Sequence, residues 1–463
     1  MPEFPDQPAA KAAALRAQGR LEEALGVRRQ IVAASPASAA AEHNLASALA
    51  DLGRFAEAEK HIRKAFEKGS DAPETWLILG RCLQSLGQFD AAERAFTQAL
   101  TRRPAMYDAQ RDLAQLRWML TSDKQRALAD IEQAVAAAPN NLQLVLLKAQ
   151  VLEYVGCNEE AYAVLAKTAV AYPGDAAIAI TAAQLAAGLG QGEDAVAHAR
   201  RAKSIAPDWP IASTMLAIAH LCAGAPTAAI AALDEASVRV PNDQHALALR
   251  ATAWRLLEDP RYRQLYDYER LVVENQIDTP EGWTSLEAYL ADLRDELHAV
   301  HRFTTHPFNQ SVRMGSQAPD LLHIDRPVFR ALPQALDGPI RKYIDALGPG
   351  EDPIRARARG GYAFKGLWSI RTRAGGFHID HVHPEGWISS ACYVELPALT
   401  NGKEGWIKFG EPGIVTKPAL GPEHFVKPAP GKLVLFPSYM WHGTVAFTDG
   451  GERLTIAFDL VPA

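Results

Sequence analysis

The sequence predicts an α-helical superhelix of repeats, followed by an α+β domain built around an all-β barrel. Residues that break helices recur at a constant interval through the first half, which indicates a repeat architecture. From Tyr362 onward, short apolar segments rich in β-branched and aromatic residues alternate with Gly and Pro, which indicates a barrel or sandwich. At 463 residues the chain is also too long for one core, and a prior of about 100–200 residues per domain predicts several domains.

The repeat in the first half has a period of 34 residues, with one residue inserted in the fourth copy. Glycines and alanines keep the same interval as the prolines. The position that ends each unit is a proline in every copy but one, where it is a serine. These positions are Pro36, Ser70, Pro104, Pro139, Pro173, Pro207 and Pro241. Each unit reads as a helix, a glycine turn, a second helix and a proline that ends it. One such helix pair cannot bury its own apolar face, so we expect the pairs to stack into a superhelix with a concave groove.

The most regular copy of the repeat, ETWLILGRCLQSLGQFDAAERAFTQALTRRP, resembles the tetratricopeptide (TPR) consensus. The matching positions are Trp76, Leu79, Gly80, Gly87, Phe89, Ala92, Phe96, Ala99 and Pro104. The resemblance implies about seven TPR repeats over residues 1–244. It also implies that the groove binds a protein or peptide segment.

The remaining boundaries follow from where the repeat stops. We expect a helical linker over residues 245–290 and a second domain over 291–463, with the barrel core at 362–463. The net charge of −6 and the lack of a long basic run argue against a nucleic-acid partner. Neither a secretory leader nor an apolar run of membrane-spanning length is evident, so the sequence predicts a cytoplasmic protein without a membrane partner.

The segment FHIDHVH at residues 377–383 offers two possible pairs of metal ligands. His378 with Asp380 has the H-x-D spacing, whereas His381 with His383 forms H-x-H. We expect the segment to be one strand, whose side chains alternate between two faces. The H-x-H pair shares its face with two bulky apolar residues and therefore should point inward, with the H-x-D pair outside. If the strand is bulged, the H-x-D pair remains the alternative.

Two later segments supply partners for these histidines. His442 ends an apolar strand and is the expected third metal ligand. Arg453 and Thr455 lie two residues apart on the last predicted strand and so share a face. Because an arginine facing a barrel interior is costly unless an anion meets it, this pair predicts a carboxylate-binding position. The Asp449–Gly450 turn before Arg453 favours a tight hairpin.

Together these segments resemble the iron(II)/2-oxoglutarate-dependent oxygenases of the double-stranded β-helix (jelly-roll) superfamily. The match is best to bacterial members in which TPR repeats precede the oxygenase domain. The resemblance implies iron(II) bound by His381, His383 and His442. It also implies 2-oxoglutarate bound by Arg453 with Thr455 and Tyr393, and no further catalytic residue. The implied activity is a dioxygenase that hydroxylates a protein or peptide substrate recruited by the TPR groove.

The second metal ligand departs from the superfamily pattern. It is usually a carboxylate, and His383 stands in its place. The β-hydroxylases of aspartyl and asparaginyl residues, which look similar here, manage without that carboxylate. Two alternatives remain open, namely an interaction scaffold with a catalytically degenerate barrel and a cupin-like enzyme that uses three histidines without 2-oxoglutarate. Arg453 argues against both, because neither needs a carboxylate clamp.

Overall fold

The computed structural model of the chain describes residues 7–237, 243–318, 320–358, 360–398, 402–448 and 450–463. Contacts divide the chain into two compact units, Met1–Val151 and Leu152–Ala463. The predicted domain boundaries at residues 244 and 290 both fall inside the second unit and stay predictions. No helix among the described residues is long and apolar enough to cross a membrane.

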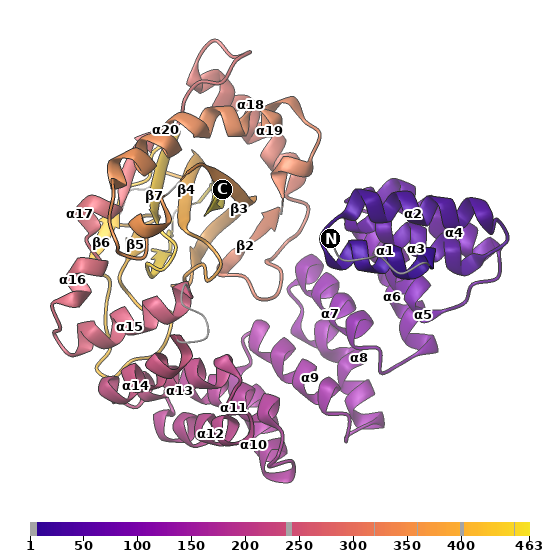
Figure 1. Cartoon of the computed structure of the whole chain (residues 1–463), viewed down its shortest axis with the longest axis horizontal. Helices are drawn as coiled ribbons and strands as arrows, with labels where there is room; N and C mark the ends of the chain where they lie inside the picture. The colour runs from indigo at the N-terminus through magenta and orange to yellow at the C-terminus, as the bar shows by residue number, and fades with distance from the viewer. Residues whose placement is uncertain (1–6, 238–242, 319, 359, 399–401, 449) are drawn as a thin grey trace. The chain divides into compact units, whose positions relative to one another are not determined.

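Helices in sequential antiparallel pairs form the repeat region (Figure 1). In the first unit they are α1 (Pro8–Ala17), α2 (Leu21–Ala34), α3 (Ala39–Asp51), α4 (Phe55–Glu67), α5 (Pro73–Ser85), α6 (Phe89–Arg102), α7 (Tyr107–Thr121) and α8 (Lys124–Ala137). Helix α9 (Leu142–Tyr154) crosses the division between the units. The second unit continues with α10 (Asn158–Ala171), α11 (Ala176–Gly188), α12 (Gly192–Ile205), α13 (Pro210–Cys222) and α14 (Pro226–Ser237).

Two glycines of the best repeat show why the consensus needs them. Gly87 joins α5 to α6 with φ of +77°, a left-handed conformation that residues with a Cβ rarely adopt. Gly80 lies against the ring of Phe96, and a Cβ at Gly80 would come within 2.4 Å of that ring. The paired helices can therefore approach closely only with glycine here. The predicted helical repeats of the TPR type are confirmed.

Residues after the repeats form the β-domain and the helices that cover it. The helices are α15 (Gln244–Leu256), α16 (Arg261–Leu265), α17 (Tyr268–Leu271), α18 (Leu286–Val300), α19 (Pro327–Arg330) and α20 (Leu332–Leu347), with 3-10 turns at Leu321–His323 and Arg355–Arg357. The strands are β1 (Val273–Gln276), β2 (Val312–Ala318), β3 (Tyr362–His378), β4 (Ile388–Glu395), β5 (Ile407–Phe409), β6 (His424–Val426), β7 (Lys432–Pro437), β8 (His442–Thr444) and β9 (Glu452–Pro462).

The strands make two antiparallel sheets, as the predicted jelly-roll class requires. The larger sheet has the order β1-β7-β4-β9-β3-β2, and the smaller has the order β6-β5-β8. The segment predicted as a helical linker thus contributes strand β1, paired with β7, as well as helices. Helix α15 is fastened to the barrel, because the indole nitrogen of Trp441 donates to Thr252 Oγ1 at 2.9 Å.

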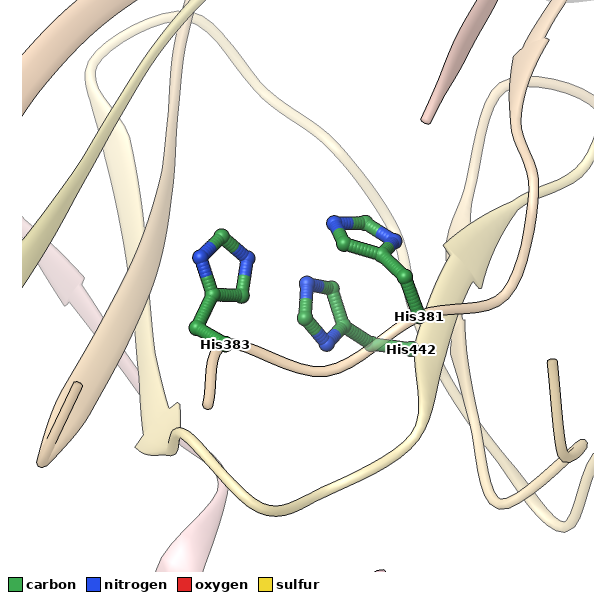
Figure 2. A group of neighbouring side chains, drawn as sticks. All are labelled: His381, His383 and His442. Carbon is green, nitrogen blue, oxygen red and sulfur yellow. The ribbon is translucent and has the colours of Figure 1, made fainter. Parts of the chain in front are cut away.

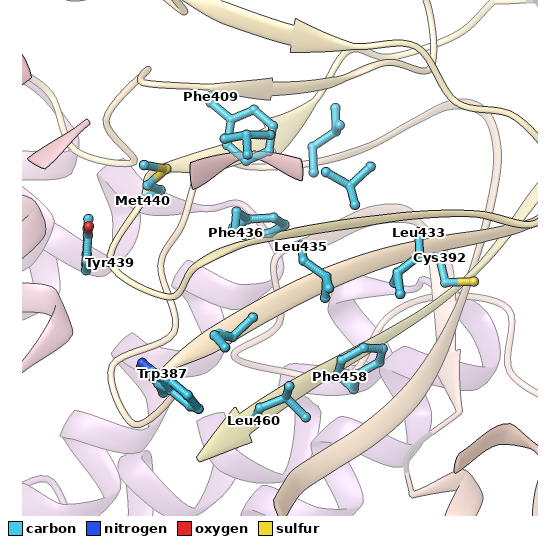
Figure 3. Close-up of a cluster of buried hydrophobic side chains, with 14 of the residues drawn as sticks. Trp387, Cys392, Phe409, Leu433, Leu435, Phe436, Tyr439, Met440, Phe458 and Leu460 are labelled. Carbon is cyan, nitrogen blue, oxygen red and sulfur yellow. The ribbon is translucent and has the colours of Figure 1, made fainter. Parts of the chain in front are cut away.

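The barrel core lies between the sheets and beneath the covering helices. Figure 3 shows buried side chains of this cluster, which come from β4, β5, β7 and β9 and from the adjoining residues Trp387, Tyr439 and Met440. Phe409 of the smaller sheet meets Phe436 of the larger sheet edge-on, with ring centroids 5.0 Å apart. On the other side of the larger sheet, α18 packs on β4 and α20 packs on β1 and β7. These helices do not cover the other face of the sheet, where β9 carries polar groups.

Two expectations about local structure are wrong. The segment from residue 377 to 383 is not a single strand, because β3 ends at His378 and the chain bends at Asp380. His381 joins the sheets only through an isolated bridge to His442. The strands on either side of the predicted hairpin also separate, since β8 pairs with β5 and β9 pairs with β3 and β4. Asp449 itself lies outside the described residues.

Candidate metal and anion site

A cavity of about 820 Å³ opens between the two sheets of the second unit. Its walls include residues of β2, β3 and β9, the bend that follows β3, and the start of β8. The cavity brings together five of the six residues predicted to bind metal or cosubstrate, namely His381, His383, His442, Arg453 and Thr455. The sixth, Tyr393, is fully buried behind the cavity wall.

Three imidazoles gather on one side of this cavity. His381 and His383 come from the bend after β3 and His442 from the first position of β8, and Figure 2 shows their rings side by side. One ring nitrogen from each lies within 4.8 Å of the others. The backbone explains the convergence: His381 N donates to His442 O at 2.9 Å, and His442 N donates to His381 O at 3.1 Å.

Each of the three rings uses its Nδ1 atom for an oxygen acceptor. His381 Nδ1 lies 2.9 Å from Ile379 O, and His442 Nδ1 lies 2.9 Å from Met440 O. His383 Nδ1 lies 2.7 Å from the carboxylate of Asp459. A neutral imidazole bonded in this way has its proton on Nδ1 and a lone pair on Nε2. The arrangement therefore directs the three Nε2 atoms toward a shared partner, with Ser311 Oγ 3.2 Å from that of His381.

Burial keeps two of these rings, those of His381 and His442, neutral. It lowers the pKa of His381 to about 3, with the neighbouring His383 adding to the effect. The pKa of His442 is held well below its usual value, first by burial and then by the nearby histidines. A histidine must be neutral to bind a metal ion, so protons compete weakly for these two rings at neutral pH.

The H-x-D pair takes two different positions. Asp380 turns away from the three histidines, and its carboxylate accepts from Lys408 Nζ at 2.8 Å. His378, expected on the outer face, lines the cavity instead. Ser311 Oγ stands between two rings, 2.9 Å from His378 Nδ1 and 3.2 Å from His381 Nε2. The alternation argument fails for His378 because the chain leaves the sheet directly after it.

Arg453 is the buried cation of the cavity. It projects from β9 with 3% of its surface exposed, and burial lowers the pKa of its guanidinium. Its Cζ lies 5.2 Å from the centre of the Tyr393 ring. Within the described part of the chain no carboxylate pairs with Arg453, and its Nε has no hydrogen-bond partner. The Tyr393 hydroxyl is a polar neighbour of the guanidinium and raises the pKa of Arg453 against the effect of burial. Burial also raises the pKa of Tyr393 to about 12, so the hydroxyl keeps its proton as a donor.

The sequence interpretation missed Asp459, Ser389 and Ser438. Asp459 lies on the same face of β9 as Arg453 and Thr455, and all three line the cavity. Its second carboxylate oxygen accepts from Ser389 Oγ at 2.7 Å, and Ser389 Oγ lies 2.8 Å from Ser438 Oγ. The even spacing in RLTIAFD was the available signal, because residues an even number apart share a face of a regular strand.

Comparisons with known proteins match both parts of the chain. Residues 366–459 match the family described as "Putative 2OG-Fe(II) oxygenase", and residues 37–105 and 79–141 match tetratricopeptide repeat families. The chain therefore combines TPR repeats with a domain of this oxygenase family, as the two resemblances in the sequence imply.

Individual relatives match the repeats. Human tetratricopeptide repeat protein 7A is 36% identical over 83 residues, which span 18% of this chain and 10% of that protein. A TPR protein from Parabacteroides merdae matches 53% of this chain and 97% of its own at 16% identity and a TM-score of 0.38. A thermophilic TPR protein of Thermus thermophilus matches 40% of this chain and 100% of its own, at 27% identity and a TM-score of 0.30.

Proposed function

We propose that the chain is an iron(II)/2-oxoglutarate-dependent dioxygenase that hydroxylates a protein or peptide substrate. The observation that carries the proposal is the cavity in which three imidazoles face a space shared with a buried guanidinium that no described carboxylate pairs with. Three histidines alone are compatible with many metalloenzymes. The added cation calls for an anionic ligand beside the metal, and the family match supports the same conclusion.

The donor set fits iron(II). Imidazole nitrogen is a suitable ligand for this ion, and three protein ligands leave coordination positions for other molecules. His381, His383 and His442 would hold the metal through Nε2, since their Nδ1 atoms already have acceptors. Bound iron(II), with 2-oxoglutarate and dioxygen, would supply the oxidising power for C–H hydroxylation.

Arg453 would bind the carboxylate of 2-oxoglutarate that does not reach the metal. Its planar guanidinium can donate two parallel hydrogen bonds to a carboxylate, which gives orientation as well as affinity. Thr455 lies on the same face of β9, and the Tyr393 hydroxyl beside the guanidinium is a further donor. A carboxylate here would satisfy the buried guanidinium, which supports 2-oxoglutarate over a neutral cosubstrate.

The repeats would recruit the substrate. TPR repeats generally mediate protein–protein interactions, and the repeats here precede the oxygenase domain in the same chain. Gln184 of α11, a helix in the repeat region of the second unit, lines the same cavity as the three histidines. Trp368 also lines it, with its ring stacked 5.9 Å from that of His383, and would exclude water from that side.

The test is turnover of 2-oxoglutarate by the purified full-length chain. With iron(II) and dioxygen present, we expect 2-oxoglutarate to become succinate and carbon dioxide, and we expect the rate to rise with a peptide substrate. Each turnover places one oxygen atom in succinate and one in the hydroxylated product. Metal binding without 2-oxoglutarate consumption would favour the cupin-like alternative. A chain that binds neither would be a scaffold.

A further inference from the structure

We propose that Asp459 is a positioning residue for the metal site, acting through His383. This inference rests on the proposed role of His383 as a metal ligand. Asp459 projects from β9 into the cavity wall, and its Oδ2 lies 2.7 Å from His383 Nδ1. The group of ligand atoms within 4.8 Å of one another contains the three histidines and not Asp459. The carboxylate therefore affects the metal site through its contact with His383 and not as a ligand.

The carboxylate is held rigidly. Asp459 is 8% exposed, and Ser389 and Ser438 are fully buried. Ser389 stands opposite Asp459 in the pairing of β4 with β9 and donates from Oγ to Asp459 Oδ1 at 2.7 Å. Ser389 Oγ also lies 2.8 Å from Ser438 Oγ. Both oxygens of Asp459 are therefore engaged, and the carboxylate cannot swing away from the histidine.

This contact determines which nitrogen of His383 carries the proton. An ionised carboxylate only accepts hydrogen bonds, so Nδ1 must donate and Nε2 keeps its lone pair. Carboxylates bonded to metal-binding histidines in this manner fix the ring's orientation and increase its basicity. The usual carboxylate ligand is missing from this site, and Asp459 would bring negative charge to the metal through the ring instead.

Among the described residues, no side chain accepts from Nδ1 of the other two histidines. His381 and His442 direct Nδ1 to the backbone carbonyls of Ile379 and Met440. Those acceptors are neutral, and no side-chain substitution removes them. Asp459 is therefore the position at which the donor strength of one ligand can be changed without touching the others.

The first experiment measures cobalt(II) affinity of the full-length chain by visible absorption. Asp459→Asn keeps the size of the side chain and removes its charge. We expect a loss of roughly 10–100-fold, the usual cost of changing a partner of a metal-binding histidine. The matched control is Asp337→Asn on α20, whose carboxylate accepts from Tyr362 Oη at 2.7 Å and Arg341 Nε at 2.8 Å. The control should stay within about two-fold of the parent.

A double-mutant cycle separates action through His383 from direct ligation. In a His383→Ala background, Asp459→Asn should change the cobalt affinity by less than about two-fold, because the ring that transmits the effect is gone. A ten-fold loss in that background would mean that Asp459 meets the metal itself, and the inference would be wrong. If the parent binds no cobalt, the proposed function fails at this step instead.

The tautomer can be measured without any metal. Long-range proton–nitrogen correlation of the ¹⁵N-histidine-labelled, metal-free chain should show His383 protonated at Nδ1, with His383→Ala assigning the signal. Asp459→Asn should shift this ring toward the Nε2–H form. A parent ring protonated at Nε2 would overturn the inference. If Asp459→Asn fails to fold, Ser389→Ala loosens the same carboxylate and should weaken cobalt binding in the same direction by a smaller factor.

Discussion

The repeat region and the barrel each bury a charged side chain, but they satisfy it differently. In the repeats, Glu42 of α3 is 3% exposed, and its carboxylate is bonded to His61 at 2.6 Å and to Lys68. In the barrel, Arg453 is equally buried, yet no described carboxylate meets it. One charge is neutralised within the fold, whereas the other has no carboxylate partner among the described residues.

This difference separates a charge that the fold itself pairs from one to which we assign a binding role. A buried charge is costly unless it is paired and hydrogen-bonded, so a fold that retains an unpaired one loses stability in the absence of a ligand. Glu42 contributes to holding helices together, and its partners come from the next helix and the residue that ends it. Arg453 stands beside three histidines, where a bound anion would complete its contacts.

The largest effect should follow removal of a histidine from the cavity. His442→Ala should lower iron(II) or cobalt(II) affinity by more than the roughly 10–100-fold typical of outer-shell substitutions, because a direct ligand is lost. Asp380→Asn is the matched control, since its carboxylate is bonded to Lys408 and not to the site. It should change affinity only a few-fold, as measured by anaerobic titration. A large loss in Asp380→Asn as well as in His442→Ala would restore the H-x-D pair, in which His442 is still the distal ligand.

Replacing the unpaired cation should affect the cosubstrate and not the metal. Arg453→Met should weaken 2-oxoglutarate binding by roughly 1.5–3 kcal/mol, the value of a charge-assisted hydrogen bond, which is about 10–150-fold. Calorimetry with cobalt-loaded protein measures this, and metal affinity should be nearly unchanged. In the absence of ligand the variant should melt no lower than the parent, because a buried unpaired charge is removed. Unchanged 2-oxoglutarate affinity would mean that residues other than Arg453 bind its carboxylate.

Acid should weaken the barrel through a buried histidine. His301 lies between Ser316 of β2 and Ser369 of β3, and burial lowers its pKa to about 3. The unfolded chain takes up this proton near pH 6.5 and the folded chain does not, so stability falls as the pH drops from about 6.5 toward 3. Between pH 7 and pH 5 the loss should be about 2 kcal/mol, or about 1.4 kcal/mol per unit once below pH 6.5.

Amide hydrogen exchange of β2 and β3, corrected for intrinsic rates, measures this loss locally. His301→Gln removes the titrating group, and its exchange protection should depend less on pH over the same range. Equal pH dependence in the parent and the variant would show that other groups control the acid sensitivity of these strands.

The smallest effect should come from unpairing the structural charge. Lys68→Met leaves Glu42 with His61 as its remaining ion-pair partner and should cost about 1 kcal/mol. A loss of this size lowers the melting midpoint by roughly 2–4 °C per kcal/mol. Lys64→Met, an exposed lysine one turn earlier on α4, is the control and should leave the midpoint unchanged. A midpoint unchanged in Lys68→Met would mean that water solvates Glu42 adequately.

Features that depend on local geometry could be predicted from the sequence. The 34-residue period identified the helix pairs, because the left-handed turn between paired helices requires a glycine with positive φ in most copies, as at Gly87. Arg453 and Thr455 could be placed on one face because β9 is a long, regular strand. The same regularity would have revealed Asp459.

The relative positions of the histidines could be known only from the tertiary structure. Alternation could not place His378, because β3 ends there and the following residues bend out of the sheet. His381 finds its position by pairing with the backbone of His442, and His383 by bonding to Asp459, 76 residues away. The sequence alone determined the repeats, the two-part organisation and which residue types carry the chemistry, since these follow from period and composition. Distances between segments far apart in the chain depend on how the sheets close, and no short-range pattern encodes that closure.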